Sequence, residues 1–422
     1  MREYLLVFAV AAVVTYLATP VARMLAIRVG AVAAPRNRDV HVTPTPRMGG
    51  LAMLIGLFAG LKVADRLPFL GVVSAQWPEP NAVMAAGAII CLLGVIDDRW
   101  PLDPLTKLAG QVVAAGVMVL LGVQWSFALN PRGDSTISLG PETAVPLTIL
   151  VTVILVNAMN FIDGLDGLLA GVTAIASGAT FYFAYELAVV KGFERASPAA
   201  LLAAVTAGVC VGFLPHNFNP AKLFMGDSGS MLVGLLSAAS MISVTGQVAY
   251  GGYTGPSQLL PSLIPLAIPL AVLAVPFIDL GLAVVRRTRA GRSPFAPDKM
   301  HLHHRMLEIS HSHKRAVLSM YFWAALVGFG GVIASFQASP WPVLLLTVGV
   351  GLAGLVGLLL YSQRRERRAR GAGPDPNAGL DPNAPVATAG PAAPAGPPAA
   401  PPAAPVGVRV GAAARRGRGG SR

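Results

Sequence analysis

Long apolar runs, separated by short charged or turn-rich breaks, repeat along most of the chain. Each run is close to the roughly 20 residues that a helix needs to cross a bilayer, and about eleven such runs can be counted. The fifth run is the least regular, because Pro146 and Asn157 interrupt it. The expected spans cover residues 4–25, 48–64, 81–97, 107–128, 144–161, 167–187, 199–215, 229–249, 259–285, 316–337 and 341–361. The pattern predicts an all-α protein, a polytopic bundle of transmembrane helices.

Lysine and arginine concentrate in alternate loops, which predicts the orientation of the bundle. Basic residues are frequent after the first, ninth and last expected spans, and sparse in the intervening loops. Because cytoplasmic loops carry the excess of positive charge, we expect the N-terminus outside and the C-terminus inside. An odd number of spans agrees with this arrangement.

Composition narrows the class further. Only 12% of the 422 residues are charged and 54% are hydrophobic, whereas a soluble domain has about 25% charged residues. The net charge of +12 does not indicate nucleic-acid binding, because no basic domain with interleaved aromatic residues is present. Cys91 and Cys210 lie inside apolar runs, as small buried residues do, and do not suggest a disulfide or a metal pair.

The composition changes abruptly near residue 366. Residues 1–365 are expected to form the transmembrane domain, and residues 366–422 form a basic tail rich in alanine, proline and glycine. A segment of this kind cannot bury enough apolar surface to fold, so we expect a disordered cytoplasmic tail. Contact of its arginines with anionic membrane lipids and a solvated tail without a role both remain open.

The acidic residues gather on one side of the expected membrane. The chain has only 20 of them, and in the topology above several lie at the cytoplasmic boundary, in four different loops. Such a concentration of negative charge requires a cation, and oxygen ligands without cysteine favour Mg²⁺, with Mn²⁺ as a substitute. Mg²⁺ commonly completes its shell with substrate phosphates, so a reaction at phosphate is indicated. The alternative, ordinary acids at helix ends, is strongest for Asp103. The residues concerned are Asp97, Asp98, Asp103, Asp163, Asp166, Asp227 and Asp298.

Two polar segments accompany these acids. Asn157, Asn160 and Asp163 are spaced three apart, so a continuous helix would bring them near one face. Asparagine can donate and accept hydrogen bonds, which suits ribose or a nucleobase, although contacts between helices are an alternative. Phe224 and Asp227 precede a small-residue run where a helix N-terminus would favour an anion such as pyrophosphate. A simple capped turn is the alternative there.

Three histidines lie close together in the longest cytoplasmic loop. His301, His303 and His304 are followed by Arg305, and no cysteine accompanies them. Zinc is therefore disfavoured, and contact with phosphate or sugar is expected. A solvated basic loop is the alternative.

Together these segments resemble a known family. Pro46 to Gly50, Asp97-Asp98, Asn157 to Gly167, Phe224 to Ser230 and His301 to His304 are similar, in this order, to the polyprenyl-phosphate N-acetylhexosamine-1-phosphate transferases of glycosyltransferase family 4. The resemblance covers about residues 1–361. Asp298 to Arg305 resembles the branch that uses N-acetylglucosamine, whereas the muramoyl-pentapeptide branch usually has three consecutive histidines.

The resemblance implies a Mg²⁺-dependent enzyme of the bacterial inner (plasma) membrane with its active site on the cytoplasmic face. It would transfer GlcNAc-1-phosphate from UDP-GlcNAc to undecaprenyl or decaprenyl phosphate and release UMP, the first membrane step of a cell-envelope glycopolymer. A phospho-MurNAc-pentapeptide transferase and, in another class, a transporter or flippase are the alternatives. Self-association as a homodimer is left open.

The resemblance also suggests roles for individual residues. Asp97, Asp98 and Asp227 are the expected catalytic residues, with Asp227 as the first choice of Mg²⁺ ligand and Asp98 as a residue that positions first and acts as a base second. The polyprenyl phosphate is already mostly ionised at neutral pH, since its second pKa is near ~6. The expected substrate-binding residues are Arg47, Lys107, Asn157, Asn160, Asp163, Asp166, Phe224, Arg292, His301, His303, His304 and Arg305.

Overall fold

The structure is a computed structural model of the whole chain, and it describes all residues except 34–43, 130–135, 249–312, 338, 355–356 and 358–422. The chain divides into two units, Met1–Arg365 and Glu366–Arg422. The expected tail, the expected span at 259–285 and the histidine loop lie outside the described residues.

Helices make up nearly all of the described part of the first unit. Two short antiparallel hairpins also occur, β1 with β2 and β3 with β4. The helices are α1 (Arg2–Val29), α2 (Gly49–Ala64), α3 (Pro68–Gln76), α4 (Glu79–Arg99), α5 (Pro104–Leu120), α6 (Pro141–Ile162), α7 (Leu168–Tyr185), α8 (Ser197–Asn217), α9 (Gly226–Val248) and α12 (His313–Ser335). The strands are β1 (Val32–Ala33), β2 (Thr45–Pro46), β3 (Phe127–Leu129) and β4 (Thr136–Ser138).

Among the described residues, 7 helical segments are long and apolar enough to cross a membrane, and three shorter apolar helices accompany them, at Gly49–Ala64, Pro104–Leu120 and Trp341–Gly354. The prediction of an all-α polytopic membrane protein is confirmed. The irregular fifth run is one continuous helix, α6, through both Pro146 and Asn157.

Two details of the prediction are wrong. The fourth expected span, 107–128, ends as a helix at Leu120, because Gly122 adopts a left-handed φ of 105° and the chain then enters the hairpin of β3 and β4. The loop expected after the second span contains α3, whose first turn begins with Pro68, a favourable place for proline. An apolar stretch this short escapes a search for bilayer-length runs.

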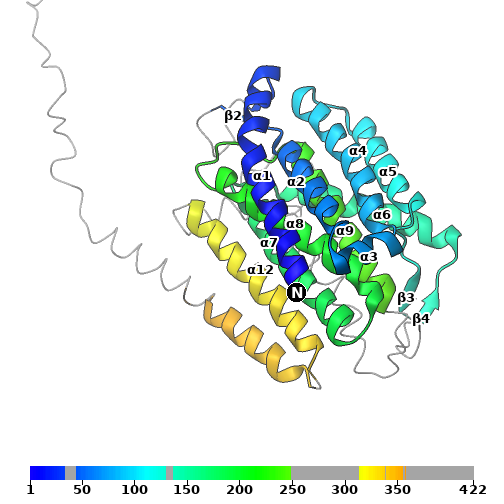
Figure 1. The fold of residues 1–422 in the computed structure, drawn as a ribbon. Helices are drawn as coiled ribbons and strands as arrows, with labels where there is room; N and C mark the ends of the chain where they lie inside the picture. The colour runs from blue at the N-terminus through cyan, green and yellow to red at the C-terminus, as the bar shows by residue number, and fades with distance from the viewer. Residues whose placement is uncertain (34–43, 130–135, 249–312, 338, 355–356, 358–422) are drawn as a thin grey trace, which may run out of the picture. The chain divides into compact units, whose positions relative to one another are not determined.

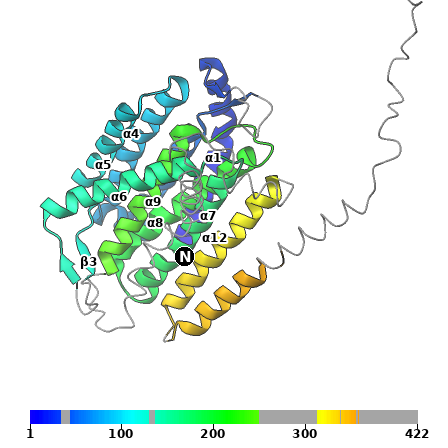
Figure 2. The ribbon, with the colours of Figure 1, turned by 180° about the vertical axis from the view of Figure 1, so that it is seen from behind.

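Consecutive long helices run in opposite directions, so their ends meet at two opposite ends of the bundle. One end gathers the last turns of α1, α4, α6 and α8 with the first turns of α2, α5, α7 and α9, through contacts such as Arg23 to Lys222, Lys107 to Asp97 and Asn160 to Asp227. At the other end, the Glu3 carboxylate of α1 accepts hydrogen bonds from the backbone N–H groups of Phe69 and Leu70 in α3. Figures 1 and 2 show α4 and α5 on one flank of the bundle and α12 on the opposite flank.

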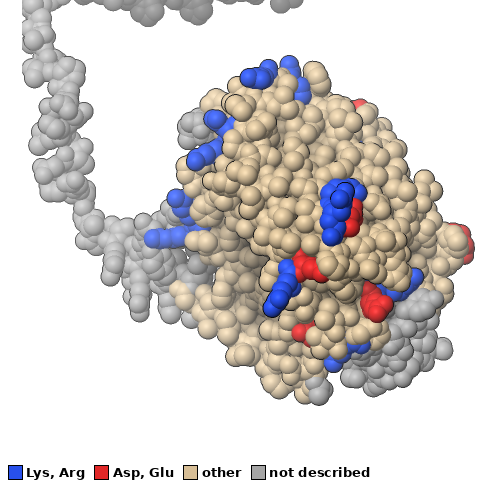
Figure 3. All heavy atoms as spheres, viewed as in Figure 1, with Lys and Arg blue, Asp and Glu red and all other residues tan. Residues whose placement is uncertain are grey.

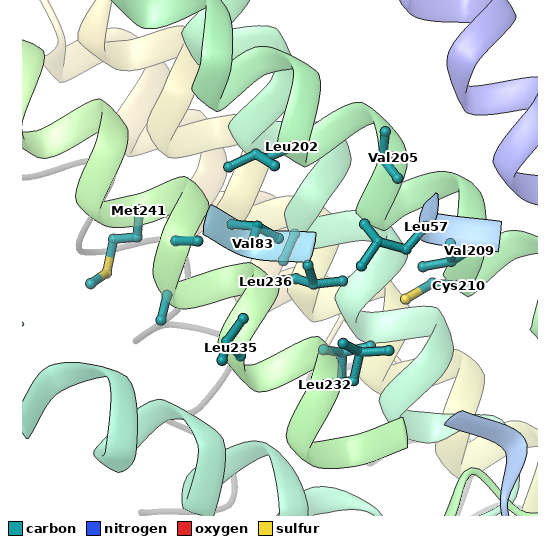
Figure 4. Close-up of a cluster of buried hydrophobic side chains, with 14 of the residues drawn as sticks. Leu57, Val83, Leu202, Val205, Val209, Cys210, Leu232, Leu235, Leu236 and Met241 are labelled. Carbon is teal, nitrogen blue, oxygen red and sulfur yellow. The ribbon is translucent and has the colours of Figure 1, made fainter. Parts of the chain in front are cut away.

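The two helices α8 and α9 form the centre of the bundle. Both are almost entirely buried, whereas α1, α6 and α12 keep large apolar side chains exposed. An α-helix that is hydrophobic on all sides is expected to lie inside a bundle. Figure 4 shows side chains of α8 and α9, such as Leu202 and Leu236, packed with Leu57 of α2 and Val83 of α4. This packing fixes α9, whose first turn carries Asp227.

Candidate active site

Side chains from four helices meet around the first turn of α9. Asp227 lies in that turn, Asp97 in the last turn of α4, Lys107 in the first turn of α5 and Asn160 in the last turn of α6. The sequence separates these residues widely, and the alternating direction of the helices brings them to one end of the bundle.

Lys107 connects the two carboxylates. Its Nζ donates to Asp97 Oδ2 at 3.2 Å and also to Asp227 Oδ2. The three side chains are 18%, 14% and 25% exposed, respectively, so solvent screens their charges only partly. The second oxygen of Asp97 accepts a hydrogen bond from the backbone N–H of Leu102, which orients this carboxylate.

Asn160 holds the other oxygen of Asp227. Its Nδ2 donates to Asp227 Oδ1 at 3.1 Å and to Ser230 Oγ at 2.8 Å. Asn157, one helical turn earlier, exchanges hydrogen bonds with Gln111 of α5 instead. The polar face expected for this segment therefore divides into Asn160, which contacts the acids, and Asn157, which joins two helices.

Asp98 lies beside the acids but has a different environment. It is 8% exposed, and its two oxygens accept hydrogen bonds from the backbone N–H groups of Asp227 at 2.9 Å and Ser228 at 3.2 Å. The Ser228 hydroxyl donates to Oδ2 as well, at 2.8 Å. A carboxylate in this position satisfies the free N–H groups of a helix N-terminus and interacts favourably with the helix dipole. The first turn of α9 is therefore capped by Asp98 of α4.

We expect Asp98→Ala to lower the free energy of unfolding by about 1–3 kcal/mol, because the capping hydrogen bonds of a buried helix start are lost. Asp98→Asn should cost less, since asparagine caps helices about as well as aspartate. Thermal unfolding in detergent micelles measures both. The matched control is Asp103→Ala, which removes the exposed N-cap of α5. A loss for Asp98→Ala no larger than that of the control would contradict the capping role.

Three glycines shape the start of α9. Gly226 has a φ of 71°, in the left-handed region that favours glycine. A Cβ on Gly94 of α4 would overlap backbone atoms of Asp227 and Ser228, and a Cβ on Gly50 of α2 would overlap those of Ser228 and Gly229. The start of α9 is thus enclosed by the backbones of two neighbouring helices.

The segment from Pro46 to Gly50 joins this arrangement through backbone hydrogen bonds. Phe224 N–H donates to Pro46 O, and the N–H groups of Gly49 and Gly50 donate to the carbonyls of Phe224 and Met225. Met48, which is buried, adopts a left-handed φ of 81°, a conformation that costs a non-glycine residue roughly 1–2 kcal/mol. Phe224 is partly exposed and lies three residues before Asp227.

Asp163 follows α6 directly and is partly exposed. Displacement of water by the surrounding protein, followed by the charges of Asp227 and Asp98, raises the pKa of Asp163 to about 8, and Arg47 opposes this shift. The largest part of this shift comes from the loss of water around the carboxyl group, which disfavours its charged form.

Asp166 has partners of its own. Its Oδ2 accepts hydrogen bonds from Asn219 Nδ2 at 2.8 Å and from the backbone N–H of Ala221 at 3.1 Å. The next residue, Gly167, donates its N–H to Asn217 Oδ1 at 3.0 Å. Asp166 therefore fixes the turn before α7 against the loop after α8.

The same turn is anchored to α12. The Tyr321 hydroxyl donates to Gly167 O, and His313 Nε2 lies 3.4 Å from Asp166 O. Since α12 begins at His313, this helix starts at the site's end of the bundle.

The sequence-based candidates divide into four groups. Within the described residues, Asp97, Asp227, Lys107 and Asn160 are in direct contact, and Asp98 is joined to Asp227 through the backbone. Arg47, Asp163 and Phe224 lie close by, whereas Asn157 and Asp166 bond to structural partners. The candidates outside the described residues are Arg292, His301, His303, His304 and Arg305.

Sequence reasoning missed several contributors. Gln111, Ser228 and Ser230 hold Asn157, Asp98 and Asn160, respectively, and Tyr321 anchors the turn. Gln111 is one helical turn after Lys107, a spacing that would have placed both on one face of α5. Nothing in the local pattern distinguishes Tyr321 from other aromatic residues of an apolar span.

The geometry bears on whether a metal ion would fit. Within the described part of the chain, no group of three or more acidic, histidine or cysteine side chains is placed to hold a metal ion. Asp97 and Asp227 nevertheless point one oxygen each at a single cation, the Lys107 ammonium. Two carboxylates with phosphate and water are a typical ligand set of Mg²⁺. The residues therefore fit a divalent ion that binds together with a phosphorylated substrate.

Comparison with known proteins agrees with this chemistry. A model described as Glycosyl transferase family 4 matches residues 81–245, the region that contains α4 to α9. The chain is 51% identical, over 80% of its own length and 83% of the relative's, to decaprenyl-phosphate N-acetylglucosaminephosphotransferase of Mycobacterium tuberculosis. It is 48% identical to the protein of that name in Mycolicibacterium smegmatis, over 86% and 90% of the two chains, and 50% identical to that of Mycobacterium leprae, over 80% and 85%. The chain belongs to glycosyl transferase family 4.

Proposed function

We propose that this protein transfers N-acetylglucosamine-1-phosphate from UDP-GlcNAc to a polyprenyl phosphate, with decaprenyl phosphate as the first acceptor to test, and releases UMP. The convergence of Asp97, Asp227, Lys107 and Asn160 from four helices carries the proposal. The names of the mycobacterial relatives support this sugar and this acceptor.

The reaction joins a lipid phosphate oxygen to the β-phosphorus of the donor, and the bond from that phosphorus to the UMP oxygen breaks. The attacking phosphate is already ionised, since its second pKa is near ~6, so the protein need not remove a proton. Its tasks are to align the two phosphorylated reactants and to balance their charge. Lys107 is suited to hold a phosphate oxygen, and Asn160 keeps Asp227 in place.

Asp97 and Asp227 would hold a divalent cation, for which we propose Mg²⁺ with Mn²⁺ as a substitute. When bound, such an ion would neutralise charge on the pyrophosphate of the donor. Asp98 acts as the residue that positions Asp227, because its oxygens are engaged by the start of α9.

Asp163, Arg47 and Phe224 are proposed to contact the nucleotide, and the histidine loop to contact the pyrophosphate or sugar. Asn157 and Asp166 are proposed to hold neighbouring segments in place, since Asn157 joins α6 to α5 and Asp166 joins the turn before α7 to the loop after α8.

We place the site at the cytoplasmic face of the bacterial plasma membrane. Figure 3 shows lysine and arginine side chains toward the end of the bundle where α1 finishes, which is the site's end, and others on the lower half of the same face, most of them beside acidic side chains. Because cytoplasmic ends carry the excess of basic residues, this supports an external N-terminus. The helix α12 begins at the site's end, and the apolar helix Trp341–Gly354 follows it, so these two crossings would return the chain to the same face and support an internal C-terminus.

The test is a transfer assay with membranes that contain the protein, decaprenyl phosphate, Mg²⁺ and UDP-GlcNAc labelled in the sugar. We expect label in the lipid fraction with an equal amount of UMP, and loss of both on addition of EDTA. Undecaprenyl phosphate in place of decaprenyl phosphate tests the acceptor. UDP-MurNAc-pentapeptide as donor should give no labelled lipid. Lipid labelled only from that donor would contradict the proposal, as would the absence of product from either donor.

A further inference from the structure

The two central carboxylates share one cation, and that cation is a side chain of the protein itself. Lys107 Nζ contacts Asp97 Oδ2 at 3.2 Å and Asp227 Oδ2 at the same time. Among the described residues, no other lysine or arginine forms an ion pair with either carboxylate. The Lys107 ammonium therefore lies between the two oxygens that a divalent cation would use.

We propose that Lys107 is the resident counter-ion of the free site and competes with the divalent cation for Asp97 and Asp227. The metal then binds tightly only when the diphosphate group of a nucleotide gives the ammonium another partner. The choice of a uridine nucleotide rests on the proposed function. The competition between Lys107 and the metal ion involves only three side chains of this protein and does not depend on that function.

The charges at this position support competition. Asp97 and Asp227 contribute −1 each and Lys107 contributes +1, so the trio carries −1. A divalent cation added beside the ammonium would bring the total charge to +1, and two mutually repelling cations would contact the same carboxylate oxygens. If the ammonium leaves, the two carboxylates and the divalent cation sum to zero. The charge of Asp98 attracts the ammonium and a divalent cation alike, and both of its oxygens are engaged by the start of α9 and the Ser228 hydroxyl, so the competition concerns Asp97 and Asp227.

The side chain of lysine suits such a role. Its ammonium is a compact point charge on a flexible four-carbon stem, so it can move to a phosphate oxygen without a shift of the backbone. The acids cannot follow it. Asp227 is held by Asn160 at its other oxygen, and Asp97 by the backbone N–H of Leu102. Departure of the ammonium would leave two fixed carboxylates facing one vacated position.

Thermodynamic linkage turns this geometry into a measurable coupling. If the nucleotide removes Lys107 from the carboxylates, it tightens metal binding, and the metal tightens nucleotide binding by the same factor. Removing the ammonium by mutation should tighten metal binding even in the absence of nucleotide.

The experiment is a titration of the purified full-length protein in detergent with Mn²⁺, in which electron paramagnetic resonance reports the free ion. Without nucleotide, we expect Lys107→Met to bind Mn²⁺ at least tenfold more tightly than the wild type. Saturating UDP should tighten binding to the wild type at least tenfold, after correction for Mn²⁺ bound by UDP alone. The same addition should have a clearly smaller effect on Lys107→Met. Equal or weaker binding to Lys107→Met without UDP would overturn the proposal.

Two further variants keep the result interpretable. Lys62→Met removes a lysine from its exposed ion pair with Asp65 and should match the wild type in both titrations. Thermal unfolding with and without Mn²⁺ shows whether Lys107→Met folds. If it does not, Lys107→Gln takes its place: this variant retains a hydrogen-bond donor without the charge and should bind Mn²⁺ more tightly than the wild type. The transfer assay is separate: a protein that shows the predicted Mn²⁺ affinities but transfers no sugar phosphate would contradict the proposed function alone.

Discussion

Replacing Asp227 by asparagine should reduce transfer of the sugar phosphate by roughly 10³-fold, the largest effect that we expect from a change of a few atoms. Asparagine keeps the size of the side chain and can still accept the hydrogen bond from Asn160. It removes the negative charge that faces Lys107 and that a divalent cation requires. The label transferred from UDP-GlcNAc to lipid, per amount of folded protein, measures the effect.

The matched control for this prediction is Asp65→Asn. Asp65 also pairs with a lysine, Lys62, but follows α2 at the opposite end of the bundle. We expect the activity of this variant to remain within twofold of the wild type. Asp227→Asn should unfold at nearly the wild-type temperature, so that low activity cannot be attributed to misfolding. Retention of more than a tenth of the activity would remove Asp227 from the mechanism.

The second large effect should come from Gly94→Ala, a substitution that adds one methyl group to α4. That carbon would lie 2.5 Å from the carbonyl carbon of Asp227 and would overlap the backbone of Ser228. Gly50 of α2 packs closely on the same turn of α9, so a shift of that turn away from Gly94 would also disturb its contact with α2. Since a misplacement of about 1 Å in a catalytic group can cost about 10²-fold, we expect at least that loss of transfer.

Stability should fall as well, by about 1–3 kcal/mol, as overpacked sites do. Gly116→Ala is the control, because it makes the same change in the interior of α5, where a Cβ would meet nothing within 4 Å. This variant should be fully active and more stable by up to about 1 kcal/mol, since alanine favours helices over glycine. Equal activities of the two variants would show that the approach of α4 to α9 does not determine the position of Asp227.

The fold was largely accessible from the sequence, because bilayer thickness sets the length of an apolar run. Nearly every expected span within the described residues corresponds to an apolar helix, with the shortened α5 as the main exception. Residues such as Phe69 and Leu70 of α3 were missed because a helix this short leaves no periodic pattern long enough to count.

The acidic residues of the candidate site could be predicted from the sequence, but the different contacts that each of them makes could not. Sequence places Asp97 and Asp98 side by side, yet adjacent residues on a helix point about 100° apart. One carboxylate therefore meets Lys107, and the other meets the backbone of α9. Which carboxylate meets Lys107 and which meets α9 depends on the relative position of the helices α4 and α9. Glycines such as Gly94 allow that close approach, but their role cannot be recognised from the local sequence, because the partner lies far along the chain.

The anchoring of Tyr321 to the turn before α7 has a consequence for how the family diversifies. A Cβ on Gly171 would overlap the Tyr321 ring, and the hydroxyl of that ring holds Gly167. A larger residue at position 171 is thus compatible only with a smaller one at position 321. We expect these two positions to change together during evolution, and homologues that have lost the tyrosine to have acquired a different brace for the turn.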